Sequence, residues 1–242
     1  MPTFWCVSNV VIKWANIFPH ELLFKLAALL TLAASVPSAY MCGRFPKSKM
    51  FKIALFNVSM AFFFFSYHVH EKTILLPLLP FAVCIRHFRY FYVDFTIVAT
   101  EIMFHLFRED KLTLQYVVIT LFYLFISEKI MRFLNLMWRE KKVYDKADPK
   151  SLLNFVLLKG VNFYRKYFRI LIYLAILGLK VAEPYIKPPV KFQYLYSLCY
   201  SVLGFGVFGI VWIYSNLKLY CWYKLEMKQQ NEKLKKSIGK DQ

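Results

Sequence analysis

Charged residues are scarce in this sequence, and those present are mostly of one sign. Asp, Glu, Lys and Arg make up 19% of the 242 residues, whereas a soluble domain carries about 25%. Acidic residues number 14 against 32 basic ones, which gives a net charge of +18. Apolar residues of the AVILMFWYC set reach 59% and lie in long blocks. The composition therefore excludes an ordinary soluble domain and indicates an integral membrane protein.

The sequence also lacks the patterns of a disulfide framework and of a zinc site. Its five cysteines are scattered, with no Cys-x-x-Cys pair and no histidine at zinc spacing. We expect neither a metal nor a cofactor. The first apolar run begins after residue 20 with no basic stretch ahead of it, so we expect no cleavable signal peptide. Without an internal repeat, residues 1–242 are interpreted as a single membrane domain ending in a basic cytosolic tail at 224–242.

Seven apolar segments have lengths near that of a membrane-spanning helix. A helix needs about 20 apolar residues to cross the bilayer core, with a range of about 17–25. An open-ended segment in lipid must satisfy its own backbone, so helices are expected rather than strands. We predict an all-α fold, a polytopic transmembrane bundle of about seven membrane-spanning helices. The segments are Leu22–Cys42, Ile53–Tyr67, Thr73–Ile85, Phe91–Phe107, Thr113–Ser127, Phe168–Ala182 and Gln193–Asn216.

The distribution of Lys and Arg among the loops predicts the orientation. With seven spans, 24 of the 32 basic residues fall on one side and six on the other, which assigns the basic loops and the C-terminus to the cytosol. The third segment is short and contains Pro77 and Pro80, but a re-entrant path would reverse the asymmetry, so we predict that it spans. Because the positive charge follows the membrane topology, the partner we expect for it is membrane lipid and no nucleic acid.

The loop between the second and third segments is the sharpest candidate site. It reads Tyr67-His68-Val69-His70-Glu71-Lys72. Ionisable residues at such a position are costly unless they are paired or hydrated, which suggests function. The alternative is a hydrated loop that only marks a helix end. His68 and His70 would point to different faces of a helix, and Ile74 occupies the position at which a zinc protease has its second histidine, which argues against a metal site.

Two stretches resemble the endoplasmic-reticulum glucosyltransferases that use dolichyl-phosphate glucose. Ser66–Pro80, read as Ser-Tyr-His-Val-His-Glu-Lys-Thr-Ile-Leu-Leu-Pro-Leu-Leu-Pro, resembles a family signature in which a phenylalanine-rich helix enters an Ile-Leu-Leu-rich one. Phe4-Trp5-Cys6 with Asn9 resembles a second family stretch, although the acidic segment that normally precedes it is absent. The resemblance covers the whole chain, but only as the C-terminal half of the family.

This resemblance implies an inverting transferase of the GT-C type in the endoplasmic reticulum membrane, with its active site in the lumen. The implied donor is dolichyl-phosphate glucose, the implied acceptor a dolichyl-pyrophosphate-linked oligosaccharide, and the new bond an α-1,3 linkage. The substrate-binding residues carried over are His68, His70, Glu71 and Lys72. The catalytic carboxylate of the family lies in an early luminal loop that has no counterpart here, so no catalytic base is assigned.

The resemblance leaves open which glucose is added. The Phe-Trp-Cys stretch favours the first glucose. The His-Val-His-Glu-Lys form and the tail leading into Lys218-Leu219-Tyr220 favour the second. We expect this chain alone to be inactive, as a truncated or partial enzyme.

Two functions of other classes remain open, namely a non-catalytic membrane subunit and a proton-coupled transporter. Glu101 and His105 lie four apart and share a helix face, as a proton relay or, more simply, as a packed pair. A transporter should show an internal repeat with interrupted helices, and none is visible. Asn57 begins a glycosylation sequon inside an apolar segment, so we expect no glycan there.

Overall fold

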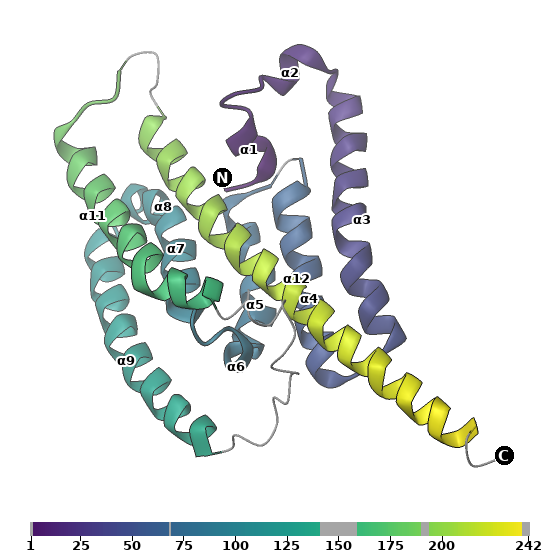
Figure 1. Cartoon of the computed structure of the whole chain (residues 1–242). Helices are drawn as coiled ribbons and strands as arrows, with labels where there is room; N and C mark the ends of the chain where they lie inside the picture. The colour runs from purple at the N-terminus through teal and green to yellow at the C-terminus, as the bar shows by residue number, and fades with distance from the viewer. Residues whose placement is uncertain (1, 68, 141–158, 190–193, 239–242) are drawn as a thin grey trace.

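The computed structural model describes residues 2–67, 69–140, 159–189 and 194–238, and contains helices but no strand in these ranges (Figure 1). The all-α prediction is therefore confirmed. Residues 71–74 form a 3-10 turn, η1, and residues 164–168 form a π-helical turn, η2. The α-helices are α1 (Phe4–Ser8), α2 (Trp14–Ile17), α3 (His20–Arg44), α4 (Ser48–Phe65), α5 (Leu75–Val83), α6 (Ile85–Phe88), α7 (Tyr92–Ile102), α8 (Phe104–Glu109), α9 (Thr113–Glu140), α11 (Arg169–Tyr185) and α12 (Leu195–Ile238).

Three helices in the described part of the chain, α3, α4 and α12, are long and apolar enough to cross a membrane. Helix α5 has only nine residues and continues η1. Successive helices nevertheless alternate in direction, and α5 carries the chain from the end of the bundle with α1 and α2 to the end with α6 (Figure 1). The structure thus shows three helices that are able to span a membrane, and seven spans stay a prediction.

The helix ends differ from the predicted segments where the chain turns polar. The fourth segment is two helices, because α7 ends at Ile102 and α8 starts at Phe104. Helix α9 continues past Ser127 to Glu140, and α12 runs through the basic tail to Ile238. Hydropathy detects only the part of a helix that is apolar enough to lie in lipid. Glu, Lys, Met and Arg favour helix in water as well, so a helix can continue past that part. An apolar run therefore gives the span but not the end of its helix.

Phenylalanine rings fill the centre of the bundle. Phe56 of α4, Phe81 of α5, Phe88 of α6 and Phe95 of α7 are all fully buried. The ring centroids of Phe81 and Phe95 lie 4.2 Å apart, and those of Phe56 and Phe88 4.9 Å apart. Aromatic pairs at such separations contribute beyond their buried area. This cluster holds the short helices α5 and α6 between the longer ones.

A line of small and polar residues joins α3 to its neighbours. Ser38 of α3 is fully buried, accepts a hydrogen bond from Asn57 Nδ2 of α4 at 2.9 Å and donates one to Asn216 Oδ1 of α12 at 3.0 Å. Interhelical hydrogen bonds of this kind hold helices together in lipid, where apolar packing alone discriminates poorly. Asn57 is fully buried in this contact, so its side chain serves packing rather than glycosylation.

The basic stretches gather at one end of the bundle. Lys47, before α4, forms an ion pair with Glu226 of α12. Lys218 of α12 donates to the carbonyl oxygen of His87 at 3.1 Å. The guanidinium of Arg165 lies 5.1 Å from the centre of the Tyr90 ring. These contacts join the four stretches that the charge tally places on the cytosolic side.

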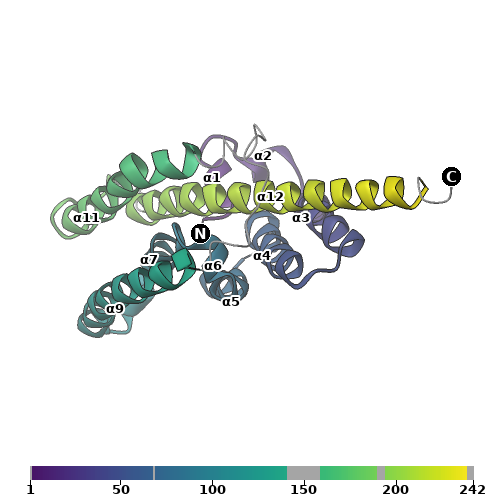
Figure 2. The ribbon, with the colours of Figure 1, turned by 60° about the horizontal axis from the view of Figure 1, so that its bottom comes forward.

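Helix α12 is the longest element, with 44 residues, and it crosses the assembly from the α11 and α7 side to the α3 and α4 side (Figure 2). It contacts α1, α3, α4, α7 and α11. Where it approaches α7, a Cβ on Gly204 would lie 2.6 Å from Ile102 Cδ1, so the end of the Ile102 side chain would have to shift. The equivalent atom on Gly209 would meet nothing within 4 Å.

Candidate functional site

The candidate loop follows the C-terminal end of α4, where Tyr67 ties it to the N-terminal part of the chain. The Tyr67 hydroxyl lies 3.1 Å from His20 Nδ1. Its ring meets the ring of Trp5 edge-on, with centroids 5.8 Å apart. His68 lies outside the described residues. Two aromatic contacts from distant parts of the sequence thus fix the start of the loop.

Apolar residues anchor the loop and leave its cationic side chains exposed. Val69 packs against the central core, and Ile74 is 1% exposed. Between them, His70 and Lys72 are exposed, and the backbone N–H of Thr73 donates to the carbonyl oxygen of His70 at 2.9 Å. The 3-10 turn η1 begins after His70. The side chain of Glu71 is outside the described set.

Trp5 joins the two stretches that carried the family resemblance. Its indole Nε1 donates to the carbonyl oxygen of Phe65 at 2.7 Å. Phe65 is the last residue of α4, and such terminal carbonyls have no partner within their own helix. The sequence placed Phe4-Trp5-Cys6 and Ser66–Pro80 in separate motifs, and the structure packs them together.

The arrangement is suited to an anionic ligand. His70 and Lys72 lie two residues apart in the connection between α4 and α5. That connection lies at the end of the bundle opposite α6 (Figure 1). An ammonium group and a protonated imidazole donate charge-assisted hydrogen bonds to phosphate oxygens. Among the described residues, no group of three or more His, Cys, Asp or Glu side chains could hold a metal ion. These two side chains can bind an anion and stabilise its charge.

An apolar groove leads to this loop along α3 and α4. It has a volume of about 320 Å³. Ala28 and Thr31 of α3 line it, and so do Phe62 of α4 and the loop residues Ser66 and Tyr67. A hydrocarbon chain in this groove would place its polar end beside the loop.

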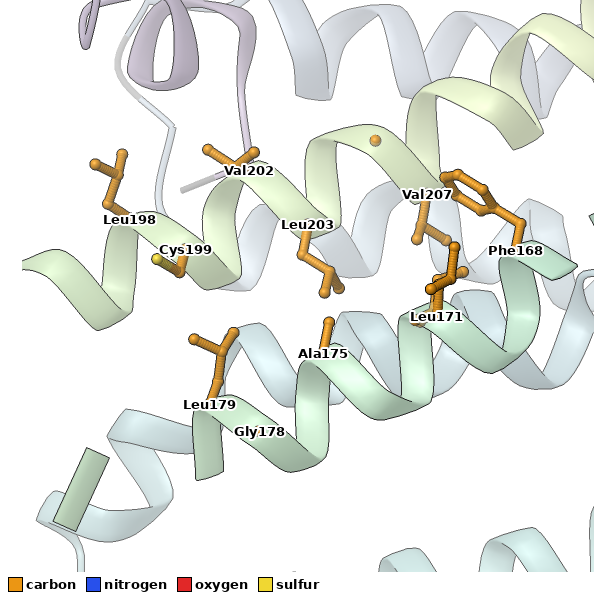
Figure 3. A pocket seen from close by; sticks show the side chains of 12 residues that line it. Phe168, Leu171, Ala175, Gly178, Leu179, Leu198, Cys199, Val202, Leu203 and Val207 are labelled. Atoms are coloured by element: carbon orange, nitrogen blue, oxygen red, sulfur yellow. The ribbon is translucent and has the colours of Figure 1, made fainter. Parts of the chain in front are cut away.

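A larger apolar groove of about 700 Å³ lies between α11 and α12 (Figure 3). Leu171, Ala175 and Leu179 of α11 face Leu203 and Val207 of α12 across it. The described residues that line it are all apolar. It suits an aliphatic chain.

Glu101 has partners that the sequence did not indicate. This 4% exposed carboxylate accepts a hydrogen bond from the Tyr116 hydroxyl at 2.7 Å and lies 3.0 Å from Lys180 Nζ. The side chain of His105, its predicted partner, is outside the described set. Tyr116 and Lys180 tie α7 to α9 and α11, which explains Glu101 as a packing group.

Asp94 is a buried charge that sequence reasoning missed. It is 1% exposed and binds the Arg169 Nε at 2.9 Å, the Tyr173 hydroxyl at 2.8 Å and the Tyr164 hydroxyl at 3.1 Å. A carboxylate inside the fourth apolar segment was the available signal, because such residues need partners in a membrane. Its partners lie 70 or more residues away, which no local pattern shows.

Their length and apolar character make these helices those of an α-helical membrane protein, with two apolar grooves and an exposed cationic loop. The profile of the ALG6, ALG8 glycosyltransferase family matches residues 1–214, and the chain belongs to that family.

Curated relatives agree with this assignment. A Dictyostelium discoideum protein is 34% identical over 74% of this chain and 34% of its own length, and one from Arabidopsis thaliana is 30% identical over 88% of this chain and 38% of its own. Both are named "Probable dolichyl pyrophosphate Man9GlcNAc2 alpha-1,3-glucosyltransferase". A Saccharomyces cerevisiae protein of that name without the qualifier is 29% identical over 90% of this chain and 41% of its own. The chain therefore spans well under half the length of these relatives.

Proposed function

We propose that this chain is part of an α-1,3-glucosyltransferase that transfers glucose from dolichyl-phosphate glucose to a dolichyl-pyrophosphate-linked oligosaccharide. Membership of the ALG6, ALG8 glycosyltransferase family carries the proposal. The relatives are named for a Man9GlcNAc2 acceptor, which supports transfer of the first glucose. The proposed location is the endoplasmic reticulum membrane.

In this proposal, His68, His70, Glu71 and Lys72 form the substrate-binding loop. The acceptor hydroxyl oxygen attacks the anomeric carbon of glucose, the bond from that carbon to the phosphate oxygen breaks, and dolichyl phosphate leaves. Charge builds up on the phosphate as it leaves, so the exposed Lys72 ammonium and a protonated His70 would stabilise the transition state. The base that accepts the hydroxyl proton is not assigned to any residue of this chain.

The groove along α3 and α4 is the proposed path of the donor's polyisoprenyl chain, because it ends at Ser66 and Tyr67 beside the loop. Ala28→Leu would fill part of it. We expect this variant to lose crosslinking to a photoreactive polyprenyl phosphate. Ala33→Leu adds the same atoms at an exposed position of α3 outside the groove and should crosslink normally. Equal labelling of both variants would contradict this path.

The proposed topology has seven spans, with the loop luminal and the C-terminus cytosolic. The asymmetry of Lys and Arg supports it, and so does their gathering at one end of the bundle. A tag placed after Gln242 should be digested when sealed microsomes are treated with protease. A protected tag would show the opposite orientation.

A chimera tests the activity directly. The matching segment of the Saccharomyces cerevisiae relative would be replaced by residues 1–214 of this chain and expressed in cells lacking that relative. We expect the lipid-linked Man9GlcNAc2 that accumulates in those cells to gain one glucose. A chimera that reaches the membrane at normal levels and transfers no glucose would favour the non-catalytic subunit.

A further inference from the structure

The first residue of α3 brings an imidazole to the start of the loop of His70 and Lys72. Helix α3 begins at His20, directly after Pro19, whose backbone is extended. Because α3 and α4 run antiparallel, the start of α3 lies beside the end of α4 (Figure 1). His20 therefore meets Tyr67, although 47 residues separate the two in the sequence.

Tyr67 holds one side of the His20 ring. The Tyr67 hydroxyl lies 3.1 Å from His20 Nδ1, and the centroids of the two rings are 6.3 Å apart. In a histidine, the contact of one ring nitrogen sets what the other can do. When the Tyr67 hydroxyl donates to Nδ1, or when the ring is protonated, Nε2 carries a hydrogen and can donate it to an anion.

His20 also extends the face of α3 that lines the apolar groove between α3 and α4. That groove is lined by Phe24, Ala27 and Thr31 of α3 and by Tyr67. The three α3 residues follow His20 by four, seven and eleven positions, which is the spacing of one helix face. A chain that lies in the groove therefore points toward His20 and Tyr67 at its polar end.

The loop of His70 and Lys72 is close to this polar end. His70 follows Tyr67 by three residues, so their Cα atoms lie at most about 11 Å apart. His20, His70 and Lys72 are all exposed. A lipid phosphate at this end of the groove can therefore be contacted from α3 as well as from the loop.

We propose that His20 binds the phosphate of the lipid donor, in addition to His70 and Lys72. This rests on the proposed function, which supplies the donor and its path along α3 and α4. A hydrogen bond from an imidazole Nε2 to a phosphate oxygen is charge-assisted. The neighbouring carboxylate of Glu21 pairs with Lys25 at 2.7 Å, which offsets its repulsion of the phosphate. The groove would thus select the isoprenoid chain, and His20 the charged headgroup.

The experiment measures equilibrium binding of farnesyl phosphate and of farnesol to the full chain in detergent. Both ligands have the same isoprenoid chain, so the ratio of their dissociation constants reports the contacts of the phosphate. His20→Ala should lower the preference for farnesyl phosphate by about tenfold or more, the effect of losing one charge-assisted hydrogen bond. The affinity for farnesol should not change. An equal loss for both ligands would mean that His20 only supports the groove, and the proposal would be wrong.

Two further variants separate a phosphate contact from a purely structural role. His20→Asn places an amide where Nδ1 lies, so it can keep the bond to Tyr67 but does not reach the position of Nε2. It should lose the preference as His20→Ala does. His20→Gln carries its amide out to the position of Nε2 and should keep part of the preference. Full preference in His20→Asn would show that His20 acts only by holding Tyr67, which would overturn the proposal.

Lys13→Ala is the control for non-specific attraction. It removes an exposed cation from the N-terminal segment, outside the groove, and should leave both dissociation constants unchanged. Equal effects of Lys13→Ala and His20→Ala would show that any nearby cation attracts the phosphate, and would contradict a specific contact.

The parent chain separates this proposal from the proposed function. If the parent chain binds farnesyl phosphate no better than farnesol, the donor path and the His20 contact are both wrong. If it prefers farnesyl phosphate and His20→Ala prefers it equally, the His20 contact alone is wrong and the donor path still holds.

Discussion

The indole Nε1 of Trp5 donates a hydrogen bond to the carbonyl oxygen of Phe65, which is 60 residues away in sequence and 2.7 Å away in space. This bond holds α1 against the end of α4, where the loop of His70 and Lys72 begins. The N-terminal helix is therefore part of the scaffold of the candidate site.

Replacing Trp5 by Phe should loosen that scaffold. The variant keeps an aromatic ring but leaves the Phe65 carbonyl without its donor, at a cost of about 1 kcal/mol, or a fall of about 2–4 °C in Tm for a chain of this size. Hydrogen exchange should quicken in residues 69–74. Trp14→Phe is the control, because the Trp14 indole donates to Ser8 within the N-terminal segment. Equal hydrogen exchange of residues 69–74 in the two variants would show that the Trp5 hydrogen bond does not stabilise the loop.

His70→Ala and Lys72→Ala should each slow glucose transfer by the active chimera. Loss of one charge-assisted hydrogen bond to the leaving phosphate corresponds to about ten- to a hundred-and-fifty-fold in rate. Protein levels should not change, because both side chains are exposed. Lys13→Ala removes an exposed cation from the N-terminal segment and should leave the rate within about twofold. Normal turnover in both loop variants would show that the loop is a hydrated helix end with no role in transfer.

Ser38→Ala should destabilise the contact of α3 with α4 and α12. The variant removes the hydroxyl that bonds both Asn57 and Asn216, at an expected cost of about 0.6–1.7 kcal/mol for an interhelical hydrogen bond in a membrane protein. Ser35→Ala is matched in residue type and helix, but the Ser35 hydroxyl bonds only the Thr31 carbonyl of its own helix. In mixed detergent, Ser38→Ala should unfold at a lower midpoint than Ser35→Ala. Identical midpoints would show that the hydrogen bonds of Ser38 to Asn57 and Asn216 do not stabilise the bundle.

Gly204→Leu should lower stability by about 1–3 kcal/mol, the usual effect of overpacking a close contact. Its first added carbon would overlap Ile102 and approach Pro2 Cβ at 3.1 Å. Gly209→Leu adds the same side chain to the same helix where a Cβ meets nothing within 4 Å. Thermal unfolding of both proteins gives the comparison. A smaller loss for Gly204→Leu than for Gly209→Leu would mean that α7 and α12 are farther apart than described.

The sequence predicted the helical class because lipid leaves a spanning chain little choice of backbone structure. It did not predict the break at Met103 or the extension of α9 to Glu140. Hydropathy detects neither feature, because one helix can end inside an apolar run and another can continue into a polar one.

The candidate loop was visible because its ionisable residues interrupt two apolar segments. The packing of Trp5 beneath it was not visible, and neither were the partners of Asp94. Each depends on which helices are neighbours, and the periodicity of a single segment carries no information about its neighbours. Resemblance brought the two motifs into one family, but only the fold brings Trp5 and Tyr67 into contact.

Helix α12 has a mechanical consequence. A continuous helix of 44 residues is about 66 Å long at about 1.5 Å per residue, roughly twice the thickness of the hydrocarbon layer. Its C-terminal half, which carries the basic residues, therefore extends as a stiff continuation of the half that packs in the bundle. A pull or twist applied to that half is transmitted as rigid rotation to the other half, where α12 forms one wall of the α11 groove and meets α7 at Gly204.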